Sequence, residues 1–364
     1  MFTPSRLSLA RRRRGLTKKH LAELIGVSDR AITAYEAGEM IPQEVTLDRL
    51  CKTLDFPPAF FAGPDLEEIP TEAASFRSMA RMTASQKHSA QASGTLALAL
   101  HEWISARFKL PEPTVPRVGP GVDPETAAEV VRAEWGLGEQ PVPNVIHLLE
   151  VHGVRVFSLT QECREVDAFS LWLQQPFVFL NTQKSAEHSR FDAAHELGHL
   201  VMHGHHEIPQ GKEIEREAHR FASAFLMPAA GLLAAAPRNP NIADLIRAKK
   251  PWRVSVSALA YRLNQLQALT DWHYRGLAVE ISKRGYRTNE PQTIQRETSQ
   301  ILNKVFLALR KEGTSKADLA RELHIHPADL DRLVFNLAIL PVDAQDLGVQ
   351  SAPPPPAERS LRLV

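Results

Sequence analysis

The spacing of apolar residues predicts a small all-helical module at the start of the chain. Leu7 and Ala10 begin an amphipathic helix, which Gly15 ends. Two more helices follow, because Thr17 and Ser28 are good N-caps and each precedes apolar residues at helical spacing. Two short helices joined by a glycine-containing turn predict a helix-turn-helix motif.

Residues at the start of the second helix of this motif are candidates for contact with DNA. That end of the helix enters the major groove in helix-turn-helix proteins. The residues that we expect near base edges or phosphates are Ser28, Asp29, Arg30 and Thr33. Arg30 is the best candidate for recognising a base, because a guanidinium can pair with guanine at two points.

The distribution of charge supports this prediction. Residues 1–30 contain eight Lys or Arg and two acidic residues, whereas the whole chain has a net charge of +1. A local basic cluster is what binding to phosphates requires. The alternative is that the run Arg11–Arg14 forms a solvated helix face or is a chance run of charge.

The middle of the chain predicts helices mixed with short strands. Helices are expected up to Trp135 and over 145–151, and strands over 154–159, 169–173 and 177–180. We therefore expect a mainly α fold with a small sheet, of the α+β class. An exposed edge strand of such a sheet could hold an extended peptide through backbone hydrogen bonds.

The remainder of the chain predicts further helices and a polar tail. Residues 315–333 have the spacing of a helix-turn-helix but lack its basic cluster, so packing or dimerisation is favoured over a second contact with DNA. Pro353–Pro356 indicate a disordered tail. The predicted divisions are a five-helix DNA-binding domain, a helical and proline-rich connector, a central α+β domain, a C-terminal helical domain and the tail, at residues 1–64, 65–120, 121–270, 271–347 and 348–364.

The segment richest in chemistry is His195-Glu196-Leu197-Gly198-His199, an H-E-x-x-H pattern in a stretch with helical spacing. Residues four apart share one helix face, so both imidazoles can bind one metal ion. Glu196 is placed to take a proton from a water molecule at that metal. The pattern predicts metal-assisted hydrolysis, most often of a peptide bond, with a chance occurrence as the alternative.

A catalytic zinc site needs a third protein ligand, and a later helix offers one. The apolar stripe of that helix includes Ala218 and Phe225, beside which Glu215 can face inward. Glu215 is the preferred ligand, Glu217 is its competitor, and His219 is a weaker third candidate.

Two residues near the motif are candidates to orient a metal ligand. Asp192 lies three residues before His195 and could accept the free ring N–H of a ligand histidine. His203 extends the helix face of His199, with capping of the helix as the alternative.

Composition sets limits on where the protein acts. No apolar run reaches the ~18 residues that a membrane span needs, and the polar, basic start lacks a signal core, so we expect neither membrane insertion nor export. Cys51 and Cys163 are lone cysteines in different predicted domains, which fits a reducing compartment without disulfides. The sequence therefore predicts a cytoplasmic protein.

The two patterns together resemble fusions of an Xre/Cro-type helix-turn-helix with an ImmA/IrrE-family (M78-like) metallopeptidase. The similarity rests on residues 16–22, 26–28, 35–38, 166–170, 176–182, 190–195 and 215–228. It implies a zincin-like fold and a Zn²⁺ ion bound by His195, His199 and Glu215, with Glu196 as the catalytic acid and base. Two positions depart from the usual pattern. Lys18, an expected DNA contact, replaces a common Gln, and His219 replaces an Asn or Asp that would support a ligand.

The resemblance also implies a function. It indicates a regulator that binds double-stranded operator DNA as a homodimer and whose zinc endopeptidase domain cleaves a regulatory protein, an Xre-type repressor or itself, in a stress or mobile-element response. Two alternatives stay open. The zincin domain could be a non-catalytic sensor or interaction module, or the chain could be an antitoxin-like partner of a neighbouring gene product.

Overall fold

The contacts of the chain divide it into two units. The computed structural model describes residues 2–69, 83–119, 121–159, 167–204, 211–338 and 359–360. Unit 1 comprises residues 1–110, 157–166 and 299–364, and unit 2 comprises 111–156 and 167–298. The region predicted as a C-terminal domain, 271–347, contributes to both units, and the five predicted divisions remain a prediction.

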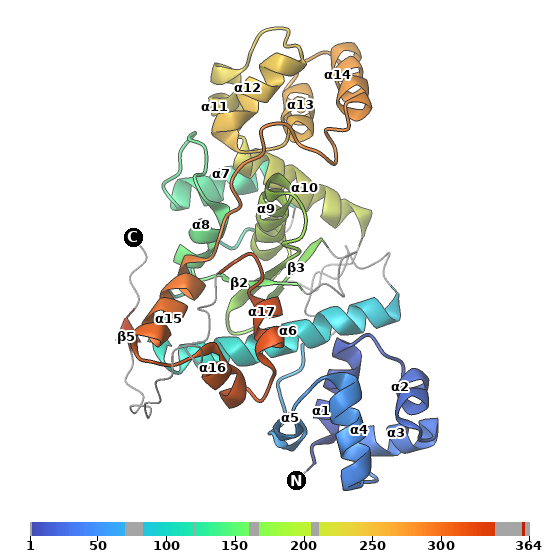
Figure 1. The fold of residues 1–364 in the computed structure, drawn as a ribbon. Helices are drawn as coiled ribbons and strands as arrows, with labels where there is room; N and C mark the ends of the chain where they lie inside the picture. The colour runs from blue at the N-terminus through green and yellow to red at the C-terminus, as the bar shows by residue number, and fades with distance from the viewer. Residues whose placement is uncertain are drawn as a thin grey trace. The chain divides into compact units, whose positions relative to one another are not determined.

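Unit 1 begins with five helices, as the apolar spacing predicts (Figure 1). The side chains of Thr17 and Ser28 cap the second and third helices by accepting the N–H groups of His20 and Ala31, at 3.1 and 3.2 Å. Gly26 ends the second helix at φ 72°, a left-handed conformation that glycine adopts without steric cost, and so makes the tight turn. The helices are α1 (Pro4–Arg13), α2 (Lys18–Ile25), α3 (Asp29–Glu36), α4 (Glu44–Leu54) and α5 (Pro58–Ala62).

The longest helix of unit 1 is α6 (Ala84–Ser105), which begins in a capping box between Thr83 and Gln86. Every residue from Ser89 to Leu98 is buried, and the helix packs against α1 and α17. It therefore packs within its own unit. The other elements of this unit are β1 (Phe108–Lys109), α15 (Gln300–Lys311), α16 (Lys316–Glu322), α17 (Pro327–Leu333) and β5 (Arg359–Ser360).

The end of the chain contributes little to the described structure. Arg359 and Ser360 form β5, which pairs in parallel with β1. The rest of the predicted tail, residues 348–358 and 361–364, lies outside the described residues, as does Cys163.

The described residues include a three-stranded sheet, which confirms the mainly α fold with a small sheet. The strand order is β2-β4-β3, and β3 and β4 are antiparallel with Ser170 opposite Val178. All three strands fall where the sequence predicts strands. They are β2 (Arg155–Ser158), β3 (Ala168–Trp172) and β4 (Pro176–Leu180).

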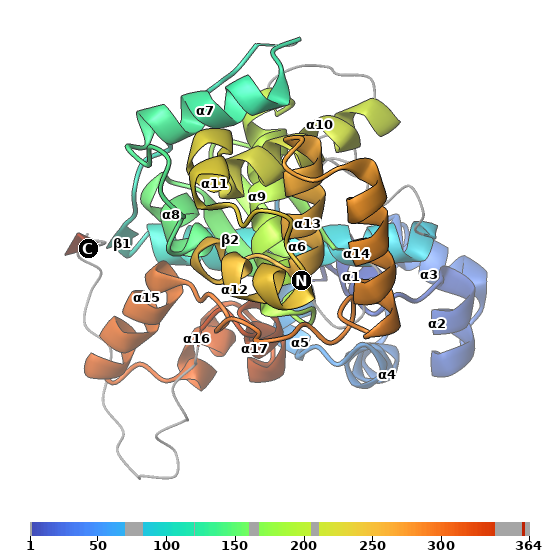
Figure 2. The same cartoon turned by 90° about the horizontal axis from the view of Figure 1, so that it is seen from above.

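Helices α9 and α10 pack against each other beside this sheet, and α9 also contacts β3 and β4 (Figure 1). Further along the chain, α12, α13 and α14 pack against one another (Figure 2). No helix among the described residues combines the length and apolar character needed to cross a membrane. The helices of unit 2 are α7 (Pro124–Glu134), α8 (Val145–Val151), α9 (Ala186–Met202), α10 (Lys212–Leu226), α11 (Ala229–Ala235), α12 (Ile242–Trp252), α13 (Val256–Gln265) and α14 (Asp271–Lys283).

Candidate metal centre and nucleic-acid interface

Two packed helices place the candidate metal ligands. His195 and His199 lie on α9. Ser185 caps the start of this helix, because its hydroxyl accepts the N–H of His188. Gly198 allows α10 to come close, because a Cβ atom at this position would lie 2.9 Å from Cδ1 of Phe221. The small residue within the H-E-x-x-H pattern thus lets α10 bring Glu215 to the two histidines.

The donor atoms of three side chains lie close together, and the two oxygens of Glu215 face different histidines. Nε2 of His195 lies 3.1 Å from Nε2 of His199, and the two oxygens of Glu215 lie 3.4 and 3.5 Å from these nitrogens. Ligand atoms around a tetrahedral zinc ion, bound at ~2.0–2.1 Å, are about 3.3 Å apart. The donor set of two imidazoles and one carboxylate is also one that zinc accepts. Among the described residues, this is the group that could hold a metal ion.

The electrostatics of these groups also suit a cation. Oε1 of Glu215 is buried and has no hydrogen-bond partner within the described part of the chain. Burial opposes ionisation of Glu215, but the adjacent imidazoles of His195 and His199 outweigh burial and hold the pKa of this carboxyl well below its usual range. Burial lowers the pKa of His199 to about 4, so its imidazole is neutral, the form that binds metals.

Glu196 lies on the same helix and is buried, with only 3% of its surface exposed. The hydroxyl of Ser170, on β3, donates a hydrogen bond of 2.7 Å to Oε2 of Glu196. This role of Ser170 was not predicted from the sequence. The signal for it was a serine at the centre of an otherwise apolar strand, where a buried hydroxyl needs a partner.

His203 and Glu217 form a chain of contacts behind His199. Nδ1 of His199 lies 3.0 Å from Nδ1 of His203, and Nε2 of His203 lies 3.0 Å from Oε2 of Glu217. If Nε2 of His199 bound a metal, its Nδ1–H would donate to His203, whose Nε2–H would donate to Glu217. The backbone N–H of His203 also caps α9 through the carbonyl of His199. Glu217 therefore contacts His203 and not the donor atoms of His195, His199 and Glu215.

Asp192 and His219, the two other candidates for orienting a ligand, contact residues other than the metal-ligand candidates. Oδ1 of Asp192 is 3.5 Å from Nε2 of His188, and its Oδ2 is buried without a hydrogen-bond partner among the described residues. Burial raises the pKa of Asp192 to about 7. The ring of His219 packs 4.8 Å from that of Phe191 and 6.5 Å from that of His195. Neither residue has a hydrogen bond to His195 in the described structure.

The candidate DNA contacts lie at the surface of α2 and α3. Asp29, Arg30 and Thr33 are exposed, and Arg30 makes no ion pair with a described residue. Ser28 is exposed too, although its hydroxyl caps α3. Nζ of Lys18, at the start of α2, lies 3.5 Å from Oε2 of Glu36.

The basic run before these helices is used inside unit 1. Each of its arginines pairs with an acidic side chain: Glu36 for Arg11, Glu68 for Arg12, and Asp329 for both Arg13 and Arg14. The side chain of Arg13 is completely buried. Neither a phosphate-binding cluster nor a solvated helix face fits Arg13. The basic count of residues 1–30 thus overstates the charge that is free to meet DNA.

Comparison with protein families finds two matching regions of the chain. Residues 7–61 match the model of the helix-turn-helix family, and residues 149–264 match that of the IrrE N-terminal-like domain, a peptidase family. A search of the curated proteins found no match. The chain is therefore the predicted fusion of an Xre-like helix-turn-helix with an M78-type, IrrE-like domain, and it combines a DNA-binding region with a peptidase-like domain.

Proposed function

We propose that this chain is a DNA-binding transcription regulator whose IrrE-like domain is a zinc-dependent endopeptidase. The observation that supports this most strongly is the group of donor atoms from His195, His199 and Glu215, whose contacts of 3.1–3.5 Å are close to the spacing of ligand atoms in a tetrahedral zinc site. The adjacent Glu196 supplies the acid–base group that hydrolysis requires. The proposed substrate is a regulatory protein, either an Xre-type repressor or a second copy of this chain.

Glu196 would serve as the acid and base of the reaction. Zinc, when bound, would supply a Lewis acid and lower the pKa of water to ~7. The carboxylate of Glu196 accepts a proton from the attacking water and delivers it to the leaving amine. The hydrogen bond from Ser170 to Oε2 helps to hold the side chain of Glu196 in one rotamer.

The sheet offers a place for the substrate backbone. In the order β2-β4-β3, strand β3 has one neighbouring strand within the described sheet. An extended peptide could bind along an edge strand of such a sheet through backbone hydrogen bonds. Because β3 contains Ser170, a substrate along this strand would lie close to Glu196.

The regulatory part of the proposal joins this chemistry to DNA. The exposed side of α3, with Arg30 and Thr33, would contact operator DNA, and the chain would bind as a homodimer because operators commonly contain two half-sites. Cleavage of a repressor, or of the chain itself, would then change transcription in a stress or mobile-element response.

The substitution Glu196→Gln tests the peptidase. The zinc-loaded full chain and the variant are incubated with repressors encoded by neighbouring genes, and the products are identified by mass spectrometry. We expect the variant to retain one zinc ion per chain and to lose at least ~10²–10⁴-fold in cleavage rate, because glutamine cannot accept the proton. Cleavage at the wild-type rate would rule out this mechanism.

The same variant separates the peptidase from a sensor. If the wild-type protein and Glu196→Gln regulate the promoter equally and neither cleaves any protein, the IrrE-like domain is a sensor or interaction module. If a neighbouring gene product instead forms a stable complex with the chain and is neutralised by it, the chain is an antitoxin-like partner.

A further inference from the structure

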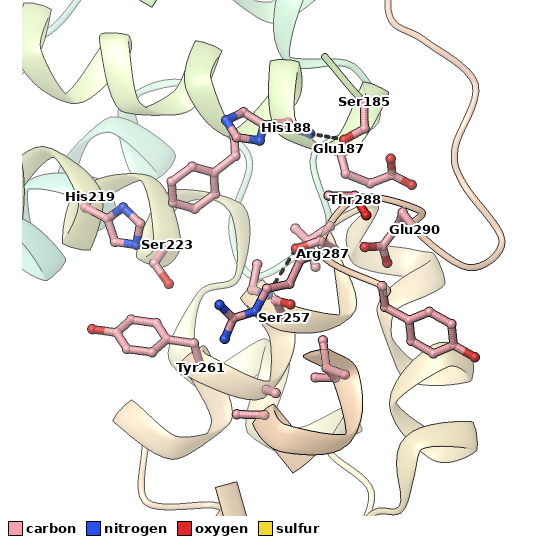
Figure 3. A pocket seen from close by; sticks show the side chains of 18 of the residues that line it. Ser185, Glu187, His188, His219, Ser223, Ser257, Tyr261, Arg287, Thr288 and Glu290 are labelled. Atoms are coloured by element: carbon pink, nitrogen blue, oxygen red, sulfur yellow. Dashed lines mark hydrogen bonds between the residues drawn. The ribbon is translucent and has the colours of Figure 1, made fainter. Parts of the chain in front are cut away.

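A pocket of about 370 Å³ lies in unit 2, between α9, α10, α13 and α14 (Figure 3). The residues that line it include Phe191 and His219 on the first two helices and Ala258, Tyr261 and Ala278 on the other two. Its volume is near the lower end of the range for small-ligand pockets and is large enough for one aromatic side chain. None of the roles discussed above uses this pocket.

The pocket begins one helical turn from the candidate metal ligands on both of the helices that hold them. Phe191 precedes His195 by four residues on α9, and His219 follows Glu215 by four residues on α10. One turn corresponds to ~5.4 Å along each helix. An extended peptide advances ~3.3 Å per residue, so a substrate with its scissile bond at the metal ligands has a neighbouring side chain within reach of the pocket.

The two ends of the pocket differ in chemistry. Figure 3 shows His219, Ser223 and Tyr261 at one end and Glu187 and Glu290 at the other. Both acids are already paired, because the buried Lys249 lies 3.5 Å from Glu187 and 3.0 Å from Glu290. The acidic end therefore offers little attraction to a cationic side chain.

The end nearer to the metal ligands is aromatic. The ring of His219 lies 4.8 Å from that of Phe191 and 6.1 Å from that of Tyr261, and Tyr261 lies 6.3 Å from Tyr274. Aromatic rings favour edge-to-face and offset contacts at such separations, in addition to the gain from burying apolar surface. A further aromatic ring is the occupant that this end would stabilise most.

We infer that this pocket binds an aromatic side chain of the substrate, on a residue next to the scissile peptide bond, and so determines the specificity of the peptidase. The inference rests on the proposed function. His219 takes a specific role in it. This residue forms the wall between the metal ligands and the pocket, in place of the support for a ligand expected at its position.

The test compares two small metal-binding probes on the zinc-loaded full chain, N-acetyl-phenylalanine hydroxamate and N-acetyl-alanine hydroxamate. Both contain the same chelating group, so their affinities differ by the side chain alone. Isothermal titration calorimetry should give a dissociation constant roughly 10- to 100-fold lower for the phenylalanine probe. Ala278→Phe fills the pocket from α14 and should abolish this preference while retaining zinc.

Val279→Phe is the matched control, because it adds the same ring to the neighbouring residue of α14, which is 54% exposed and outside the pocket lining. It should keep the wild-type preference. Equal affinities of the wild-type protein for the two probes, or a preference that survives Ala278→Phe, would overturn the inference and leave the zinc peptidase standing. A protein that binds no zinc would overturn the proposed function, and the specificity pocket with it.

Discussion

The candidate metal centre and the helix-turn-helix surface differ in what holds their functional side chains in position. Glu196 and His199 are each 3% exposed, and neighbouring helices and strands hold them. Asp29, Arg30 and Thr33 are exposed, and what would hold them in place is the DNA. In the first region, folding itself assembles the chemistry. In the second, folding supplies a helix at the surface and leaves the recognition to the partner.

The arginines of unit 1 show the same contrast between buried and exposed side chains. Arg13 is completely buried beside Asp329, whereas Arg30 is exposed and makes no ion pair with a described residue. Both count equally in the net charge of the segment. Only exposed and unpaired cations can release counterions from DNA phosphates, so the location of each cation decides its function.

The largest expected effect tests whether the basic run is structural. Asp329 is completely buried and lies 3.0 Å from Arg14, 3.5 Å from Arg13 and 3.0 Å from Arg332. Asp329→Asn removes the charge that compensates these guanidiniums and should lower the free energy of unfolding by about 3–5 kcal/mol. Urea unfolding of the full chain, followed by circular dichroism, measures the change.

Asp55→Asn is the matched control for this substitution. Asp55 also contacts Arg14, at 3.5 Å, but its side chain is 62% exposed. An exposed pair of this kind contributes about 0–1 kcal/mol, so the control should unfold almost like the wild-type protein. Equal effects of the two substitutions would mean that burial does not distinguish the roles of these arginines.

The second prediction concerns the support behind His199. Glu217→Ala removes the acceptor that holds His203, and should weaken zinc binding roughly 10- to 100-fold, measured by competition with a chromogenic chelator. Glu217→Gln should recover most of the affinity, because its amide oxygen still accepts the hydrogen bond. This rescue separates a positioning role from general damage to α10.

Glu213→Ala provides the comparison on the same helix, because Glu213 is 59% exposed and pairs only with Arg216 among the described residues. It should bind zinc like the wild-type protein. If Glu217→Ala also retains wild-type affinity, the contact chain from His199 to Glu217 does not support the metal ligand. If it loses zinc as completely as Glu215→Ala does, Glu217 is itself a ligand.

Contacts within one helix could be predicted from the sequence, whereas contacts between separate elements could not. His195 and His199 could be paired from the sequence because a helix fixes the geometry of residues four apart. The sequence could not by itself decide between Glu215 and its neighbours as the third ligand. The orientation of α10 relative to α9 depends on the packing of Gly198 against Phe221. The contact of Ser170 with Glu196 could not be predicted, because it joins a strand to a helix 26 residues away.

The errors arose where the sequence does not reveal burial. The run Arg11–Arg14 has the composition of a phosphate-binding surface, and its main partner, Asp329, is 315 residues away from Arg14. No local pattern connects residues so far apart. The helix-turn-helix itself was predictable because its caps, Thr17 and Ser28, and its turn at Gly26 are local features.

The smallest expected effect tests the exposed side of the comparison. Arg30→Ala should weaken binding to the DNA upstream of the chain's own gene by about tenfold, because one guanidinium contact to a base is lost. The free energy of unfolding should change by less than about 0.5 kcal/mol, since Arg30 is exposed.

Arg321→Ala is the control for Arg30→Ala. The side chain of Arg321 is 70% exposed on α16, in the segment whose spacing is that of a helix-turn-helix without a basic cluster. Fluorescence anisotropy with labelled DNA measures both variants. Weaker binding by Arg321→Ala, with Arg30→Ala unchanged, would assign the contact with DNA to the C-terminal helices and reverse the comparison.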